Sequence, residues 1–147
     1  MNRDFVEMLS ALRDVGAEYL VVGAHALAAH GRPRATGDLD LWIRPTPTNA
    51  SRVYDALQAF GAPLQQLRVD ELAAPDLVFQ IGVAPARIDI LTSVSGVGFD
   101  DAWPDRINVR IGELDVPVIG REALIRNKRA TGRPRDIADI AELEGTA

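Results

Sequence analysis

Two carboxylates stand one residue apart in the stretch Gly37-Asp38-Leu39-Asp40-Leu41-Trp42-Ile43. Because side chains at positions i and i+2 of a β-strand point to the same face, we expect Asp38 and Asp40 to project together. Adjacent carboxylates repel each other, and a divalent cation that prefers oxygen ligands, such as Mg²⁺, would relieve that repulsion. The stretch therefore predicts a metal-binding strand or, as the alternative, the solvated edge of a half-buried strand.

The segment upstream of this strand predicts an anion-binding turn. Residues 19–22 are apolar and β-branched or aromatic, as in a buried strand, and Gly23 then begins an Ala-rich helical stretch that ends near Gly31. The first N–H groups of such a helix have no intrahelical partner and lie at the positive end of its dipole, which suits a phosphate. A basic loop, residues 32–36, joins this helix to the strand with the two acids.

A third carboxylate, Asp89, lies within the apolar run of residues 86–92, which predicts another strand. An acid that is buried without a partner is strongly destabilising. A metal ion shared with the first two carboxylates would supply a partner, and so would a salt bridge to an arginine such as Arg87 or Arg34. The sequence leaves both alternatives open.

These motifs, in this order, resemble the nucleotidyltransferase superfamily, which has the polymerase-beta-like fold. The family pattern is an apolar strand, a Gly-Gly or Gly-Ser pair, a short helix, an Asp-x-Asp strand and a later Asp; the corresponding residues are Gly23-Ala24, Asp38-Leu39-Asp40 and Asp89. The resemblance covers most of the chain, including residues 124–140, and points to small bacterial nucleotidyltransferases related to the toxin enzymes of abortive-infection systems. One departure is Ala24, which offers a triphosphate only backbone donors where a Ser would add a hydroxyl.

The resemblance implies an α/β (α+β) fold, a mixed twisted β-sheet flanked by helices. It also implies an enzyme that moves a nucleoside monophosphate from an NTP to a hydroxyl of RNA, a protein or a small molecule. The implied cofactor is Mg²⁺, as two ions, with Mn²⁺ as an alternative, and the implied catalytic and metal-binding residues are Asp38, Asp40 and Asp89. The nucleotide-binding residues would be Gly23, Ala24, Arg34, Thr36, Lys128 and Arg133.

Basic residues gather late in the chain, at a density that suits a triphosphate or an RNA backbone, although a solvated helical face is an equal alternative. Lys128 is the only lysine among 16 basic residues, and a compact ammonium suits a phosphate. It follows Leu124 by one helical turn, so we expect it to share the face that packs inward. The basic residues of this region are Arg121, Arg126, Lys128, Arg129, Arg133 and Arg135.

The composition is that of one globular domain, residues 1–147, with a C-terminal helical pair at about 121–144. Hydrophobic residues make up 47% and charged residues 25%, which argues against disorder, and the net charge of −5 argues against a general nucleic-acid coat. The chain has no cysteine for disulfides or thiolate metal sites, and it shows neither a signal peptide nor an apolar run that could span a bilayer, so we expect a cytoplasmic protein.

Hydrophobic periodicity and turn residues predict the remaining elements. Strands are expected at 77–83, 86–91, 108–111 and 114–119, the last two as a hairpin. Residues 94–98 are expected to form a flexible loop. Helices are expected at 4–15, from about 46–48 to 60, 66–73, 122–131 and 134–144.

Two other functional classes remain open from the sequence. The first is a nucleotide-binding module without turnover, which the missing hydroxyl at Ala24 favours. The second is a toxin-like protein that acts through a protein or RNA partner. Nucleotide binding without product would identify the first, and co-purification of a partner without NTP binding would identify the second.

Overall fold

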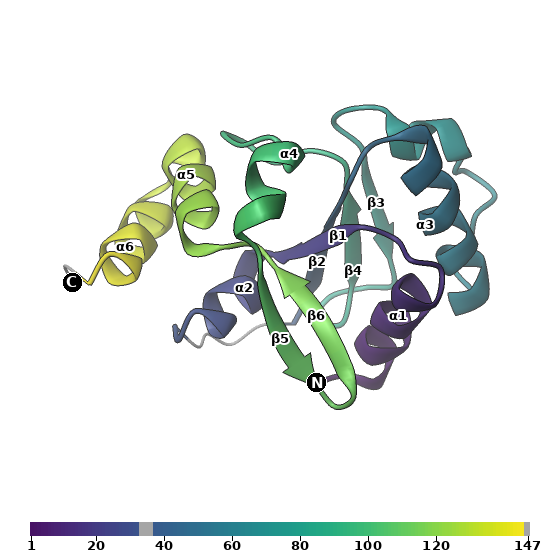
Figure 1. Cartoon of the computed structure of the whole chain (residues 1–147), viewed down its shortest axis with the longest axis horizontal. Helices are drawn as coiled ribbons and strands as arrows, with labels where there is room; N and C mark the ends of the chain where they lie inside the picture. The colour runs from purple at the N-terminus through teal and green to yellow at the C-terminus, as the bar shows by residue number, and fades with distance from the viewer. Residues whose placement is uncertain (33–36, 146–147) are drawn as a thin grey trace.

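The computed structural model describes residues 1–32 and 37–145 and contains a six-stranded mixed β-sheet flanked by helices (Figure 1). This is the fold class that the sequence predicts. The spatial order of the strands is β3-β4-β2-β1-β6-β5. The strands are β1 (Tyr19–Val22), β2 (Leu39–Ile43), β3 (Val78–Ile81), β4 (Ile88–Leu91), β5 (Ile107–Ile111) and β6 (Leu114–Val118).

The helices follow local signals in the sequence. The side chain of Asn2 accepts a hydrogen bond at the start of the first helix, and the third helix begins after Thr46 with a proline in its first turn and ends at Gly61 in the left-handed conformation. The α-helices are α1 (Arg3–Asp14), α2 (Gly23–Ala29), α3 (Pro47–Phe60), α4 (Phe99–Ala102), α5 (Arg121–Thr131) and α6 (Pro134–Leu143). None of the helices in the described residues is long and apolar enough to cross a membrane.

The differences from the predicted elements occur where segments are short. The helix expected at 66–73 is a 3₁₀ turn, η1 (Val69–Ala73), and α4 with the adjoining 3₁₀ turn η2 (Trp103–Asp105) was not predicted. Segments of three to five residues are too short to show a helical period, so the pattern carries no signal for them.

The expected flexible loop at 94–98 is instead an ordered turn in which Val94 bridges to Val97. Gly96 has φ +84°, and a Cβ there would lie 2.5 Å from the Cβ of Ala130 and 2.8 Å from the carbonyl oxygen of Arg126. Only a glycine lets this turn pack so closely against α5. Nearby, the side-chain amide of Asn127 donates to the carbonyl oxygen of Ser95 at 2.9 Å. Residues 94–97 therefore set the position of α5 beside the sheet.

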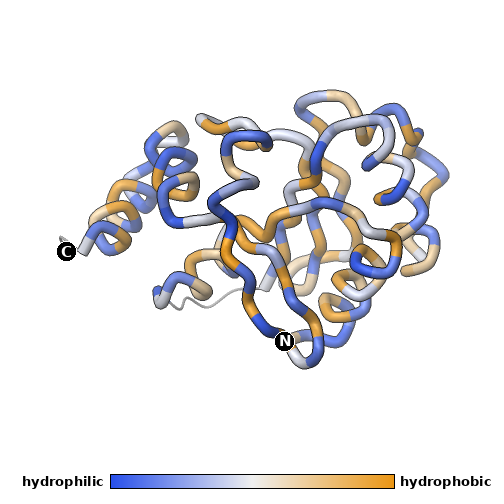
Figure 2. The backbone as a smooth tube through the Cα atoms, in the orientation of Figure 1, coloured by the Kyte–Doolittle hydropathy of each residue, from blue (hydrophilic) through white to orange (hydrophobic). Residues whose placement is uncertain are grey.

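The central strands form the core of the molecule. Every residue of β1 is buried, and hydrophobic segments concentrate on the strands while the helices alternate between hydrophobic and hydrophilic stretches (Figure 2). Trp42 is 1% exposed, with its ring centroid 5.1 Å from that of Phe99. The residue therefore packs in the core, and it is unable to stack on a nucleotide base.

Strand β2 occupies the centre of the sheet between β1, which is antiparallel to it, and β4, which is parallel. In this register Asp40 lies opposite Val22 on one side and Asp89 on the other. Pairing of two strands that are distant in the sequence thus brings the second and third acids together. Beyond the sheet, α5 and α6 pack on each other at one end of the molecule (Figure 1).

Candidate active site

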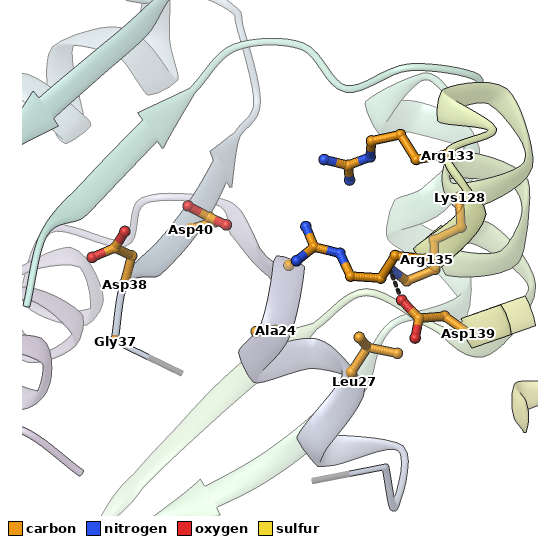
Figure 3. A pocket seen from close by; sticks show the side chains of 10 residues that line it. Ala24, Leu27, Gly37, Asp38, Asp40, Lys128, Arg133, Arg135 and Asp139 are labelled. Atoms are coloured by element: carbon orange, nitrogen blue, oxygen red, sulfur yellow. Dashed lines mark hydrogen bonds and ion pairs between the residues drawn. The ribbon is translucent and has the colours of Figure 1, made fainter. Parts of the chain in front are cut away.

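One cavity of about 360 Å³ lies between the sheet and the C-terminal helices (Figure 3). The first turn of α2 and the start of β2 line one side of it, through Gly23, Ala24, Asp38 and Asp40. The helices α5 and α6 line the opposite side, through Lys128, Arg133, Arg135 and Asp139. Two segments that are about 90 residues apart in the sequence therefore face each other with opposite charge.

Gly23 makes the turn from β1 into α2. Its φ is +69°, and a Cβ at this position would overlap the Oδ2 atom of Asp40. A glycine is therefore required both by the backbone conformation and by the close approach of the carboxylate. Val22, which caps α2, provides no side-chain hydrogen bond to the first turn. The backbone N–H groups at Gly23-Ala24 thus begin a helix next to a carboxylate and beside the cavity.

The structure brings the three predicted acids together; we call Asp38, Asp40 and Asp89 the acid cluster. Asp38 lies immediately before β2, Asp40 lies within it, and Asp89 is opposite Asp40 on β4 and only 7% exposed. Burial, followed by the charge of Asp89, raises the pKa of Asp40 to about 6. Burial and the neighbouring carboxylate therefore both disfavour the charged form of Asp40.

Arg87 is the guanidinium partner of this cluster. Its Nε and Nη2 atoms donate to the two carboxylate oxygens of Asp89 at 2.7 and 3.2 Å, and Nη2 also lies 3.2 Å from Oδ2 of Asp38. The backbone N–H of Arg87 donates to Oδ1 of Asp38 at 3.0 Å. The salt bridge to Arg87, one of the two alternatives for Asp89, is therefore present. In residues 1–32 and 37–145, no three His, Cys, Asp or Glu side chains are grouped so as to hold a metal ion.

Two cations on the helical side of the cavity, Lys128 and Arg133, are paired with acids. Lys128 is buried, as its spacing from Leu124 predicts, and its Nζ lies 2.9 Å from Oδ2 of Asp139 and 3.5 Å from Oδ1 of Asp136. Arg133 donates from Nε and Nη2 to Asp136 at 2.7 and 3.2 Å. The hydrogen bond from Arg133 holds the pKa of Asp136 well below its usual range. The two acids thus fix the positions of Lys128 and Arg133.

Arg135 belongs to the same side of the cavity, although sequence reasoning did not select it as a site residue. It is exposed, and its side chain extends from α6 toward Asp40, alongside that of Arg133 (Figure 3). Its spacing of two residues from Arg133 was the available signal. We refer to Lys128, Arg133 and Arg135 as the basic cluster. The other two predicted nucleotide-binding residues, Arg34 and Thr36, lie outside the described residues.

The whole structure is similar to two solved structures of nucleotidyltransferases. One is a provisionally assigned nucleotidyltransferase from Thermotoga maritima, with a TM-score of 0.66 and 13% sequence identity over 99% of this chain and 92% of that chain. The other is the lincosamide antibiotic adenylyltransferase LnuA with bound lincomycin, with a TM-score of 0.60 and 12% identity over 100% of this chain and 98% of that chain. No protein-family model and no curated protein matches the sequence. The chain therefore has a nucleotidyltransferase-like fold, which confirms the fold that its motifs predict.

Proposed function

We propose that this chain is a metal-dependent nucleotidyltransferase that moves a nucleoside monophosphate from an NTP to a hydroxyl acceptor. The observation that carries the proposal is the cavity in which Asp38 and Asp40 face Lys128, Arg133 and Arg135. Carboxylates suit a hard divalent cation, and ammonium and guanidinium groups suit phosphate oxygens. The catalytic unit is proposed to be the single domain of residues 1–147, with the C-terminal helical pair as part of its site.

In this proposal the triphosphate lies over Gly23-Ala24 and against the basic cluster. The backbone N–H groups of the turn donate to the phosphates without the hydroxyl that a Ser at position 24 would add, and the cations opposite neutralise the phosphate charge. Lys128 contributes a point charge and Arg133 a planar fork, each oriented by its acid partner. Arg34 and Thr36 are retained as further nucleotide-binding candidates.

The acid cluster suits a divalent ion by its donor chemistry, although its three side chains are not grouped as a metal site in the described residues. Its oxygen donors are those that Mg²⁺ and Mn²⁺ prefer, and a bound cation would offset the burial and the charge of Asp89 that raise the pKa of Asp40. Asp38 and Asp40 would hold the metal, as two ions in our proposal, with Asp89 as a third ligand or as a base. The bound metal would supply charge neutralisation for the reacting phosphate.

The proposed transfer is a substitution at the α-phosphorus. A bond forms between the acceptor hydroxyl oxygen and the α-phosphorus, and the bond from that phosphorus to the oxygen bridging to the β-phosphate breaks. Pyrophosphate leaves, and the hydroxyl proton passes to a carboxylate of the acid cluster, for which Asp89 is our candidate. Positioning by the basic cluster and neutralisation of charge would provide most of the rate enhancement.

The acceptor class is proposed from the comparison with LnuA, which acts on lincosamide antibiotics. A small hydroxyl-bearing molecule of that kind is our first candidate, and RNA and protein hydroxyls are the others. Incubation of the protein with each labelled NTP, Mg²⁺ and lincomycin or a cell extract tests this. We expect label in one acceptor fraction, and none when EDTA is added. Label in no fraction with any NTP would contradict the proposal.

A nucleotide-binding module without turnover is the second candidate, because Arg87 already occupies Asp89 and Asp38. Calorimetric titration of NTP and Mg²⁺ separates the two candidates, since the module would bind nucleotide without forming pyrophosphate. Binding of neither nucleotide nor metal, with a co-purifying protein, would instead favour action through a partner.

A further inference from the structure

Arg87 places a positive charge inside the acid cluster, where a metal ion would also be attracted. Its guanidinium contacts both oxygens of Asp89, at 2.7 and 3.2 Å, and reaches Asp38 at 3.2 Å. Both oxygens of Asp89 are thus used as acceptors, and a divalent ion bound between Asp89 and Asp38 would meet the positive charge of the guanidinium in the same space. Occupation of Asp89 by the guanidinium and by a metal ion is therefore mutually competitive.

The two partners differ in how firmly they are held. The Asp89 side chain is 10% exposed and is fixed by pairing of β4 with β2 and β3, whereas the Arg87 side chain is 30% exposed and lies before the start of β4. A long, partly exposed arginine side chain can rotate into water without disturbing the strand. The carboxylate would stay in place when the guanidinium leaves.

We propose that Arg87 is a built-in counter-ion that occupies Asp89 in the metal-free protein and must be displaced before a divalent ion can use all three acids. The inference rests on the proposed function only for the assumption that the acid cluster binds a metal. Only protein molecules in which Arg87 has left Asp89 can then bind the ion through all three acids, and they are a minor fraction of the metal-free protein. The apparent dissociation constant for the ion therefore equals the intrinsic one divided by that fraction. Arg87 would thereby prevent metal binding when the ion concentration is low, and it would neutralise the repulsion between the acids until a metal ion binds.

A titration with Mn²⁺ alone at constant pH, in which electron paramagnetic resonance measures the free ion, tests the role of Arg87 without requiring catalysis. Arg87→Gln should bind Mn²⁺ about tenfold more tightly than the wild type, because removal of a competitor that occupies the site about 90% of the time gives that factor. Arg110→Gln is the matched control, since Arg110 pairs with an exposed acid, Asp115, on the β5–β6 hairpin. This control should bind like the wild type.

The double variant Arg87→Gln/Asp89→Asn shows whether Asp89 is the group that is released. Its affinity should return to about the wild-type value, because the freed ligand is gone. Arg87→Lys, which keeps a cation, should lie between the wild type and Arg87→Gln, and it keeps the test valid if Arg87→Gln folds poorly. Equal or weaker Mn²⁺ binding by folded Arg87→Gln and Arg87→Lys would overturn the proposal. Tighter binding by these variants in a protein that transfers no nucleotide would overturn the proposed function alone.

Discussion

The acid cluster and the basic cluster face each other across one cavity but balance their charges differently. In the acid cluster, Asp38 and Asp89 share the guanidinium of Arg87, whereas Lys128 and Arg133 each have a buried acid beside them, Asp139 and Asp136. Burial, followed by the charge of Asp89, raises the pKa of Asp40 to about 6, whereas the hydrogen bond from Arg133 holds the pKa of Asp136 well below its usual range. The sheet side therefore has a deficit of positive charge that a cation would fill, and the helical side has cations whose positions are set in advance.

Removal of the acid cluster's first two charges should have the largest effect. Asp38→Asn/Asp40→Asn should abolish metal-dependent nucleotide binding and lower transfer by about 10³-fold or more, because the proposed ligands of the metal are lost. Calorimetric titration of Mg²⁺ and NTP measures the binding. Asp115→Asn, on the exposed hairpin, is the control and should behave like the wild type. Unchanged binding in the double variant would remove the metal from this end of the cavity.

Substitution of the third acid separates catalysis from stability. Asp89→Asn should lower transfer by about 10²–10³-fold while most of the NTP affinity remains, because the amide oxygen still accepts from Arg87 but no longer carries the charge. The kcat and the melting temperature are measured together. A large loss of melting temperature, with activity surviving in the folded fraction, would assign Asp89 to a structural salt bridge with Arg87.

On the opposite side, Lys128→Ala should weaken NTP binding by about 10- to 100-fold, since a charge-assisted phosphate contact contributes about 1.5–3 kcal/mol. Lys128→Arg should restore the affinity only in part, because a planar head replaces a point charge. Arg129→Ala, on the same helix but paired with Glu144 at the surface, is the matched control. NTP affinity equal to that of the wild type in Lys128→Ala would leave Arg133 as the next candidate.

The raised pKa of Asp40 predicts the pH dependence of metal binding. Below pH 6 its carboxyl is protonated in the metal-free protein and above pH 6 it is charged, so Mn²⁺ affinity should fall about tenfold per pH unit below 6 and level off above 7. Carboxyl carbon resonances of the metal-free protein should show one Asp titrating near pH 6. If every Asp instead titrates below pH 4.5, the pKa of Asp40 is not raised, and the proposed electrostatic difference between the two clusters is contradicted.

The smallest effect is expected at Arg135. Because its side chain is exposed, Arg135→Ala should leave the melting temperature unchanged and weaken NTP binding by about three- to tenfold. Arg126→Ala, on the adjacent helix, serves as the control for loss of one positive charge. A reduced melting temperature with full NTP affinity would show that Arg135 supports the helical pair instead of the ligand.

Much of this architecture could be predicted from local patterns. The strand with the two acids, the turn at Gly23 and the inward direction of Lys128 all follow from spacings of a few residues, which is the range over which periodicity is informative. Asp38 is the exception at this scale, since it precedes the strand that was expected to contain it.

The remainder depends on contacts between distant segments. The parallel pairing of β2 with β4, which sets Asp89 opposite Asp40, has no local signal, and neither does the approach of Arg135 to the acids. Trp42 shows the same limit, because its place in the alternating stretch does not reveal that Phe99 packs against it. The salt bridge at Arg87 was foreseen only as one of two alternatives for Asp89, because the sequence does not show that a single guanidinium reaches two acids.

The contact at Gly96 sets the distance between the two sides of the cavity, and substitution there could change substrate preference in proteins with this fold. The turn of residues 94–97 rests against the Ala130 methyl group and the Arg126 carbonyl oxygen of α5, and Gly96 contributes only a hydrogen atom to this contact. A bulkier residue at position 96 would push α5 away from the turn, together with α6, which packs on it. All three cations of the basic cluster would then move away from the acids. The size of substrate that the cavity accepts would thus depend on position 96, although this residue does not contact the substrate.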